Sequence, residues 1–235
     1  MKKLRTKKQS VFFAILLVSF ALLMYINSCQ ENPITSPSAA LYLKTDTTST
    51  SDAANITLDS AKIIVEDIKF HRASPKDSSN IKLGPFRVYI NLNFGNLTEW
   101  GVNGVPPGSY DKVSFYIHKH NPNDPLPNND SDFVNDSGTV GYSAVIAGTY
   151  NGESFVYRSP KSAHQKVTID PPLVIPEATD GVFNATLVVN PKLWFLKNGQ
   201  YIDPRDPANA NDIDNNIKDS FNKAFKDQNK DGIPD

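Results

Sequence analysis

Alternation of apolar and polar residues over short segments constrains the fold of this chain more than any other feature. In residues 86–94, FRVYINLNF, the apolar residues occupy one face and Arg, Tyr and Asn the other. Residues 110–120, YDKVSFYIHKH, alternate in the same way. A period of two is that of a β-strand with one buried face. Helical periodicity is absent between residues 57 and 200, so we expect β structure throughout this range.

Turn signals separate these segments. The apolar face of residues 61–71 changes phase at Glu66–Asp67, which indicates a β-bulge. Asn151-Gly152 predicts a type I′ hairpin turn, and the polar residues 121–138 predict a long surface loop. About seven short strands predict a mainly β fold, an antiparallel β-sandwich of the immunoglobulin-like or transthyretin-like type, with a barrel as the alternative.

Composition narrows the class of protein. With 39% hydrophobic and 10% aromatic residues among 235, the chain can bury a sizeable core. Its one cysteine, Cys29, excludes an intrachain disulfide. The five basic residues within positions 2–8 have no acidic counterpart up to residue 28, so the remainder is mildly acidic. Because phosphate binding needs clustered Lys and Arg, we expect no nucleic-acid partner.

The first 29 residues have the pattern of an export signal. Residues 11–26 form an apolar run whose helix would rise about 24 Å, short of the roughly 30 Å of a bilayer core. This length favours a secretory signal over a spanning helix. The following INSC resembles the lipobox of bacterial type II signal peptides. That resemblance implies a diacylglycerol on the Cys29 sulfur, cleavage before Cys29 and a lipid anchor; an uncleaved membrane anchor is the alternative.

We therefore expect a protein secreted across the inner membrane and held by its lipid in the outer membrane, because Gln30 is not the Asp that the lipoprotein family associates with inner-membrane retention. The membrane face stays open. The expected domains are listed in order along the chain: a lipoprotein signal peptide (1–28), a flexible Ser/Thr/Pro tether (29–56), a β-sandwich (57–200), and a C-terminal helix with an Asp-rich loop (201–235).

A second resemblance covers residues 57–120. A PxGxY turn, here Pro107, Gly108 and Tyr110, leads into the strand that follows. Together with the preceding alternating segments it is similar to a family of uncharacterised bacterial surface β-sandwich lipoproteins. That family has no assigned chemistry, so the resemblance implies a fold and a location.

The C-terminal segment changes pattern. Ile213, Ile217, Phe221 and Phe225 recur every four residues, which predicts one amphipathic helix over residues 209–226 that docks on the sandwich.

A calcium-type loop follows this predicted helix. Asp227, Asn229 and Asp231 alternate before a glycine, as in the first half of an EF-hand loop, with the carbonyl of Ile233 and the carboxylate of Asp235 as further ligands. The sequence also resembles thrombospondin type 3 and dockerin calcium repeats. The glutamate of position 12 has no counterpart. We expect at most weak Ca²⁺ binding, with Kd about 10⁻⁴–10⁻³ M; the alternative is a solvated acidic end.

Other candidate sites are less specific. Tyr89, Trp100 and Tyr116 are candidates for an aromatic platform that binds sugar rings, although tyrosine is common on strands. His118 and His120 fall on one predicted strand face, where a transition metal could bridge them.

No Gly-x-Ser-x-Gly, HExxH or phosphate-binding glycine loop occurs. The sequence thus predicts a non-catalytic, lipid-anchored envelope protein with a structural or adhesive role. A carbohydrate- or peptide-binding module is the alternative, and a hydrolase a weaker one. Ligand, envelope partner and oligomeric state stay open.

Overall fold

The chain folds mainly into β-strands, as the alternation predicts. The computed structural model describes residues 37–45, 55–74, 81–82, 87–91, 96–177 and 180–235, which belong to one unit beginning at Ser36. The strands are β1 (Ser38–Thr45), β2 (Ile56–Arg72), β3 (Ile81–Lys82), β4 (Arg87–Asn91), β5 (Leu97–Gly104), β6 (Gly108–Ile117), β7 (Ala144–Tyr150), β8 (Glu153–Ser159), β9 (Ala163–Ile175), β10 (Val182–Val189), β11 (Leu196–Lys197), β12 (Gln200–Tyr201) and β13 (Lys223–Lys226).

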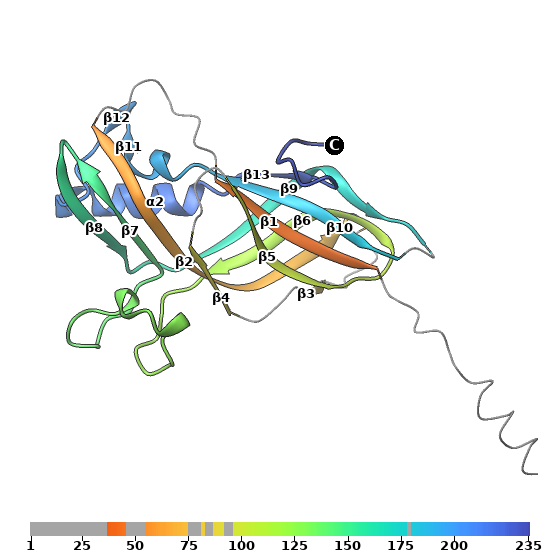
Figure 1. Cartoon of the computed structure of the whole chain (residues 1–235), viewed down its shortest axis with the longest axis horizontal. Helices are drawn as coiled ribbons and strands as arrows, with labels where there is room; N and C mark the ends of the chain where they lie inside the picture. The colour runs from red at the N-terminus through yellow and green to blue at the C-terminus, as the bar shows by residue number, and fades with distance from the viewer. Residues whose placement is uncertain (1–36, 46–54, 75–80, 83–86, 92–95, 178–179) are drawn as a thin grey trace, which may run out of the picture. The chain divides into compact units, whose positions relative to one another are not determined.

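Nine of these strands form one continuous sheet that curls around its core (Figure 1). Their order is β5-β1-β10-β13-β9-β6-β2-β7-β8, and β3 and β4 pair with β2 beside this path. The expected antiparallel arrangement is wrong, because β1 runs parallel to β10 and β13 runs parallel to β9. Both parallel pairs join segments distant in the chain, which the local alternation does not reveal. The sheet is therefore mixed.

Strand β1 lies inside the segment expected to be a flexible tether. Residues 38–45 pair on one side with β10 and on the other with β5, and the side chains of Leu41 and Leu43 are fully buried. The predicted tether of residues 29–56 therefore does not extend over this stretch. Its five apolar residues, AALYL, are flanked by Ser, Thr and Pro, so the composition of the longer segment is that of a tether although this short run forms a strand.

Two local predictions are confirmed. The pairing of β2 with β6 shifts register between Glu66 and Lys69, and Asp67 between them has φ of 54°. This is the bulge expected from the change of phase. Between β7 and β8, Asn151 and Gly152 have φ of 53° and 80°, the two positive values that a type I′ turn requires.

The main hydrophobic core contains buried side chains from all nine strands of this path. Trp100 of β5 packs edge-on against Phe115 of β6, with ring centroids 5.2 Å apart. Phe221 packs against the same Phe115 ring at 5.3 Å. Such edge-to-face contacts stabilise aromatic clusters by about 0.5–1.5 kcal/mol each beyond burial. Strands β5 and β6 therefore share one core with the C-terminal segment that contains Phe221.

A smaller apolar cluster lies apart from this core. Phe133, in a 3₁₀ turn of the polar loop, packs fully buried against Ile64 and Val145. Burial alone would lower the pKa of Lys62, but its ammonium contacts Asp130 at 2.8 Å and Asp132 at 2.7 Å, and the net pKa is raised. The loop expected over residues 121–138 is thus held to the sheet by one aromatic anchor and one shared lysine.

The C-terminal helix is shorter than predicted. Helix α2 spans Ala210–Asp219, and Ile213 and Ile217 are its buried apolar residues. The chain then leaves the helix, and Phe225, which we expected in the same helical stripe, lies in strand β13. A spacing of four residues suits both structures, because residues i and i+4 share one face of a helix and also one face of a strand. The helix predicted over residues 209–226 is therefore wrong beyond Asp219.

Candidate functional site

The calcium-type sequence forms a turn directly after β13. This strand pairs antiparallel with β10, from Ala185 opposite Lys226 to Val188 opposite Lys223. On its other side it pairs with β9 through Ala224 and Ile169. The turn that follows is thus carried on a strand inside the sheet (Figure 1).

Asp227 is the buried centre of this turn, with no exposed surface. The Thr186 hydroxyl donates to its carboxylate at 2.6 Å, and the Gly232 N–H donates to the same oxygen, Oδ2, at 3.0 Å. The Asp231 N–H donates to Oδ1 at 3.1 Å. Three donors compensate for much of the desolvation of this buried carboxylate. Asp227 therefore connects the end of the chain to strand β10.

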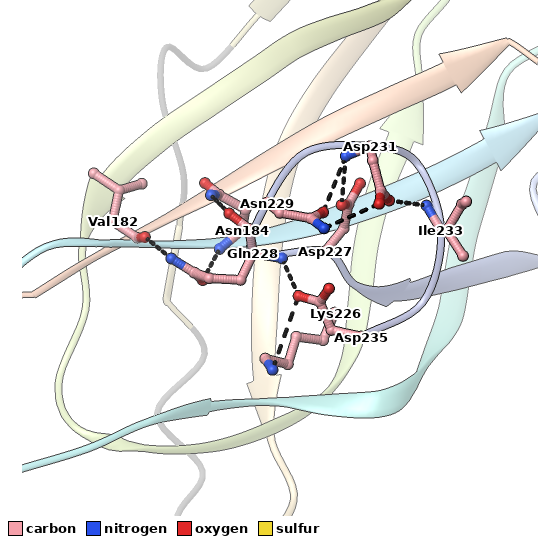
Figure 2. Close-up of polar contacts among 9 residues, drawn as sticks. All are labelled: Val182, Asn184, Lys226, Asp227, Gln228, Asn229, Asp231, Ile233 and Asp235. Atoms are coloured by element: carbon pink, nitrogen blue, oxygen red, sulfur yellow. Dashed lines mark hydrogen bonds and ion pairs between the residues drawn. The ribbon is translucent and has the colours of Figure 1, made fainter.

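The exposed half of the turn is ordered by shorter-range contacts (Figure 2). The Asp231 N–H donates to Asn229 Oδ1 at 3.1 Å, and the Ile233 N–H donates to Asp231 Oδ1 at 2.8 Å. Asn229 Nδ2 donates to the other Asp231 carboxylate oxygen at 2.9 Å. Gly232 has φ of 75°, the conformation for which a glycine was expected at this position.

The five predicted calcium ligands do not all converge. Asp227, Asn229 and Asp231 share the turn, but the Asp235 carboxylate accepts from the Gln228 N–H and lies 3.9 Å from Lys226 Nζ (Figure 2). In the part of the chain that the structure describes, no three His, Cys, Asp or Glu side chains are grouped to hold a metal ion. The turn thus offers two carboxylates and one amide oxygen, a partial fit to calcium.

The sequence did not point to the side chains that hold the turn from outside. Lys44 of β1 donates to the Gly232 carbonyl at 2.9 Å. Lys230 lies over the Tyr42 ring at 4.9 Å, and the Tyr42 hydroxyl donates to Glu99 of β5 at 2.8 Å. The ring's hydroxyl raises the pKa of Lys230, with a smaller contribution from Glu99. Tyr42 and Lys44 alternate along β1 with the buried Leu41 and Leu43. The period of two therefore places them on the opposite face of the strand, and this is the signal in the sequence that could have identified them.

Of the three residues predicted for an aromatic platform, Trp100 does not lie at the surface. Trp100 is 2% exposed and Trp194 is fully buried, so both indoles belong to the core. Tyr116 is half-buried and stacks on the exposed His164 ring, with centroids 4.2 Å apart. Tyr89 lies in β4, and its side chain is outside the described part of the structure.

The two histidines considered for a transition metal lie beyond the end of β6. His118 Nδ1 is 3.1 Å from Glu66 Oε2, an ion pair when the imidazole is protonated. His120 is 1% exposed, and its backbone N–H donates to the Tyr142 carbonyl. One therefore faces a carboxylate and the other is enclosed, and among the described residues neither belongs to a group of three or more side chains that could hold a metal ion.

The apolar run of residues 11–26 and Cys29 lie outside the described residues. Among the residues that are described, no helix is long and apolar enough to cross a membrane. Comparison with protein-family models, curated proteins and solved structures finds no match for this chain.

The buried contacts of Asp227 predict that the fold loses stability when this residue is replaced. Replacing Asp227 with Ala leaves the Thr186 hydroxyl and the buried Gly232 N–H without an acceptor, so we expect the free energy of unfolding to fall by about 2–4 kcal/mol. Asp231→Asn, at an exposed position of the same turn, keeps one acceptor oxygen for the Ile233 N–H and is expected to change the free energy of unfolding by about 0.5 kcal/mol or less. Urea denaturation of the full chain measures both. Equal effects of the two variants would contradict the anchoring role of Asp227.

Proposed function

We propose that this chain is a lipid-anchored protein of a bacterial cell envelope with a non-catalytic, structural or adhesive role. The observation that carries the proposal is the sequence INSC, which ends a basic and apolar leader at the only cysteine of the chain. A buried methylene contributes about 0.8 kcal/mol, so the two or three acyl chains of a lipoprotein give lasting attachment.

Because β1 begins at Ser38, the tether between Cys29 and the folded unit is shorter than the predicted residues 29–56. Eight residues, 30–37, separate Cys29 from the first residue of β1. Fully extended, they span at most about 29 Å. A lipid on Cys29 would therefore keep the folded unit close to the bilayer. This short reach favours a structural role at the membrane over adhesion to a distant surface.

Lipidation of Cys29 is directly measurable. Expressed in a bacterial host with an alkyne-bearing fatty acid, the wild-type protein is expected to take up label and to begin at residue 29 by mass spectrometry. Cys29→Ser is expected to take up none and to keep its leader. Ser28→Ala, which retains a small residue before the cysteine, serves as the matched control and is expected to be labelled. An unlabelled wild-type protein with an intact leader would refute the proposed anchor.

Weak calcium binding at the C-terminal turn is the second part of the proposal. It is supported by the shared turn of Asp227, Asn229 and Asp231 and by the positive φ of the following glycine. Because the turn also closes through its own hydrogen bonds, we expect calcium to add to its stability without being required for folding.

Calorimetry of the full-length protein in detergent is expected to give Kd of about 10⁻⁴–10⁻³ M for Ca²⁺. Asp231→Ala removes an exposed ligand and is expected to weaken binding about tenfold or more. Asp219→Ala removes a carboxylate at the end of helix α2, outside the turn, and is expected to leave binding unchanged. No heat with millimolar Ca²⁺, or equal losses in the two variants, would refute a site at the turn.

A further inference from the structure

A recess of about 140 Å³ lies between helix α2 and the segment that joins β8 to β9. Its apolar lining includes Ile117, Ala163 and Ile217, and its polar lining includes Asp214. One water takes up roughly 30 Å³ in the liquid, so the recess has room for a small organic molecule. It lies apart from the C-terminal turn, and none of the candidate sites predicted from the sequence includes its residues.

Asp214 is a buried carboxylate with two different oxygens. Its side chain belongs to α2 and the residue is 6% exposed. The hydroxyls of Tyr157 and Ser159, both on β8, donate to Oδ1 at 2.7 Å each. Burial raises the pKa of Tyr157, and the hydrogen bond to Asp214 raises it further, so the phenol keeps its proton and donates. These two bonds fasten the helix to the edge strand of the sheet.

The second oxygen, Oδ2, does not take part in joining the helix to β8. Among the described residues, no donor reaches it, although Asp214 lines the recess. The partners of Oδ1 are neutral hydroxyls, so the negative charge is not balanced by them. Oδ2 is also absent from the buried polar atoms that lack a partner, so it is accessible on the wall of the recess, where an ammonium group can reach it.

Two cationic residues also line the recess. These are Lys161 and Lys218, and both residues are exposed. Lys218 Nζ lies 3.5 Å from the neighbouring Asp219 carboxylate and forms an ion pair with it. The recess therefore combines a negatively charged acceptor oxygen with an apolar lining, and its two lysines are exposed to solvent, which screens their repulsion of a bound cation.

We propose that this recess binds a free small organic amine, with its primary ammonium group on Asp214 Oδ2 and its short alkyl body against Ile117, Ala163 and Ile217. An ammonium donates a charge-assisted hydrogen bond to a carboxylate, and such bonds are about twice as strong as neutral ones. The alkyl part gains from the apolar lining. A neutral alcohol of the same shape lacks the charge, and a carboxylate is repelled by Asp214.

The test compares three probes of equal size. Propylammonium, 1-propanol and propionate are titrated into full-length, ¹⁵N-labelled protein in detergent, and the amide shifts of Ala163 and Ile217 are followed. We expect saturable shifts with propylammonium and at least tenfold weaker binding of the other two. Equal binding of 1-propanol would overturn the proposal, and so would the absence of saturable shifts with propylammonium.

Two variants separate the site from the fold. Asp214→Asn keeps an oxygen for the two hydroxyls but loses the charge, and it is expected to weaken propylammonium binding at least tenfold. Ala163→Leu fills the recess while leaving residue 214 unchanged, and it is expected to abolish binding. This second variant tests the proposal even if Asp214→Asn does not fold. Asp219→Asn, an exposed carboxylate on the same helix, is the matched control and should bind normally. Unchanged binding in Asp214→Asn or in Ala163→Leu would overturn the assignment.

Discussion

The insertion of strand β13 between β10 and β9 is the constraint on which the rest of the structure depends. Without these four residues, β10 and β9 would each present unpaired backbone groups within the sheet, and unpaired backbone groups in a buried position are costly. The strand also brings Ala224 and Phe225 into the interior, where each is less than 3% exposed. The C-terminal residues are therefore part of the β-sheet itself.

The two ends of the described chain meet on the same strand. β1 lies on one side of β10 and β13 on the other, and Lys44 of β1 reaches the carbonyl of Gly232 in the C-terminal turn. Contacts between residues this far apart in sequence carry a large loop-closure entropy cost, which the packing of the sheet must offset. The membrane-proximal end in our proposal and the calcium-type turn are thus two parts of one structural region.

Local structure followed from the sequence wherever one pattern favoured one conformation. The bulge at Asp67 and the hairpin turn at Asn151-Gly152 are of this kind, because a change of phase and a pair of residues that tolerate positive φ each point to one geometry. The spacing of Phe221 and Phe225 suited both a helix and a strand, and the strand forms at Phe225 because it pairs with β10.

The candidate site could be predicted only in its local part. Asp227, Asn229 and Asp231 occur within five residues, so their common turn was visible in the sequence. The contribution of Thr186 depends on which strands are neighbours, and a single sequence does not encode this in any short pattern. The same holds for Asp214, whose two hydroxyl partners come from a strand more than 50 residues earlier in the chain.

Amide hydrogen exchange of residues 223–226 tests the central claim most directly. If β13 is an interior strand, its amides that bond to β10 exchange as slowly as those of β10 itself, because both open only when the sheet opens. Exchange of residues 223–226 at the rate of an unstructured peptide, while β10 stays protected, would show that the C-terminal segment lies outside the sheet and would contradict the account.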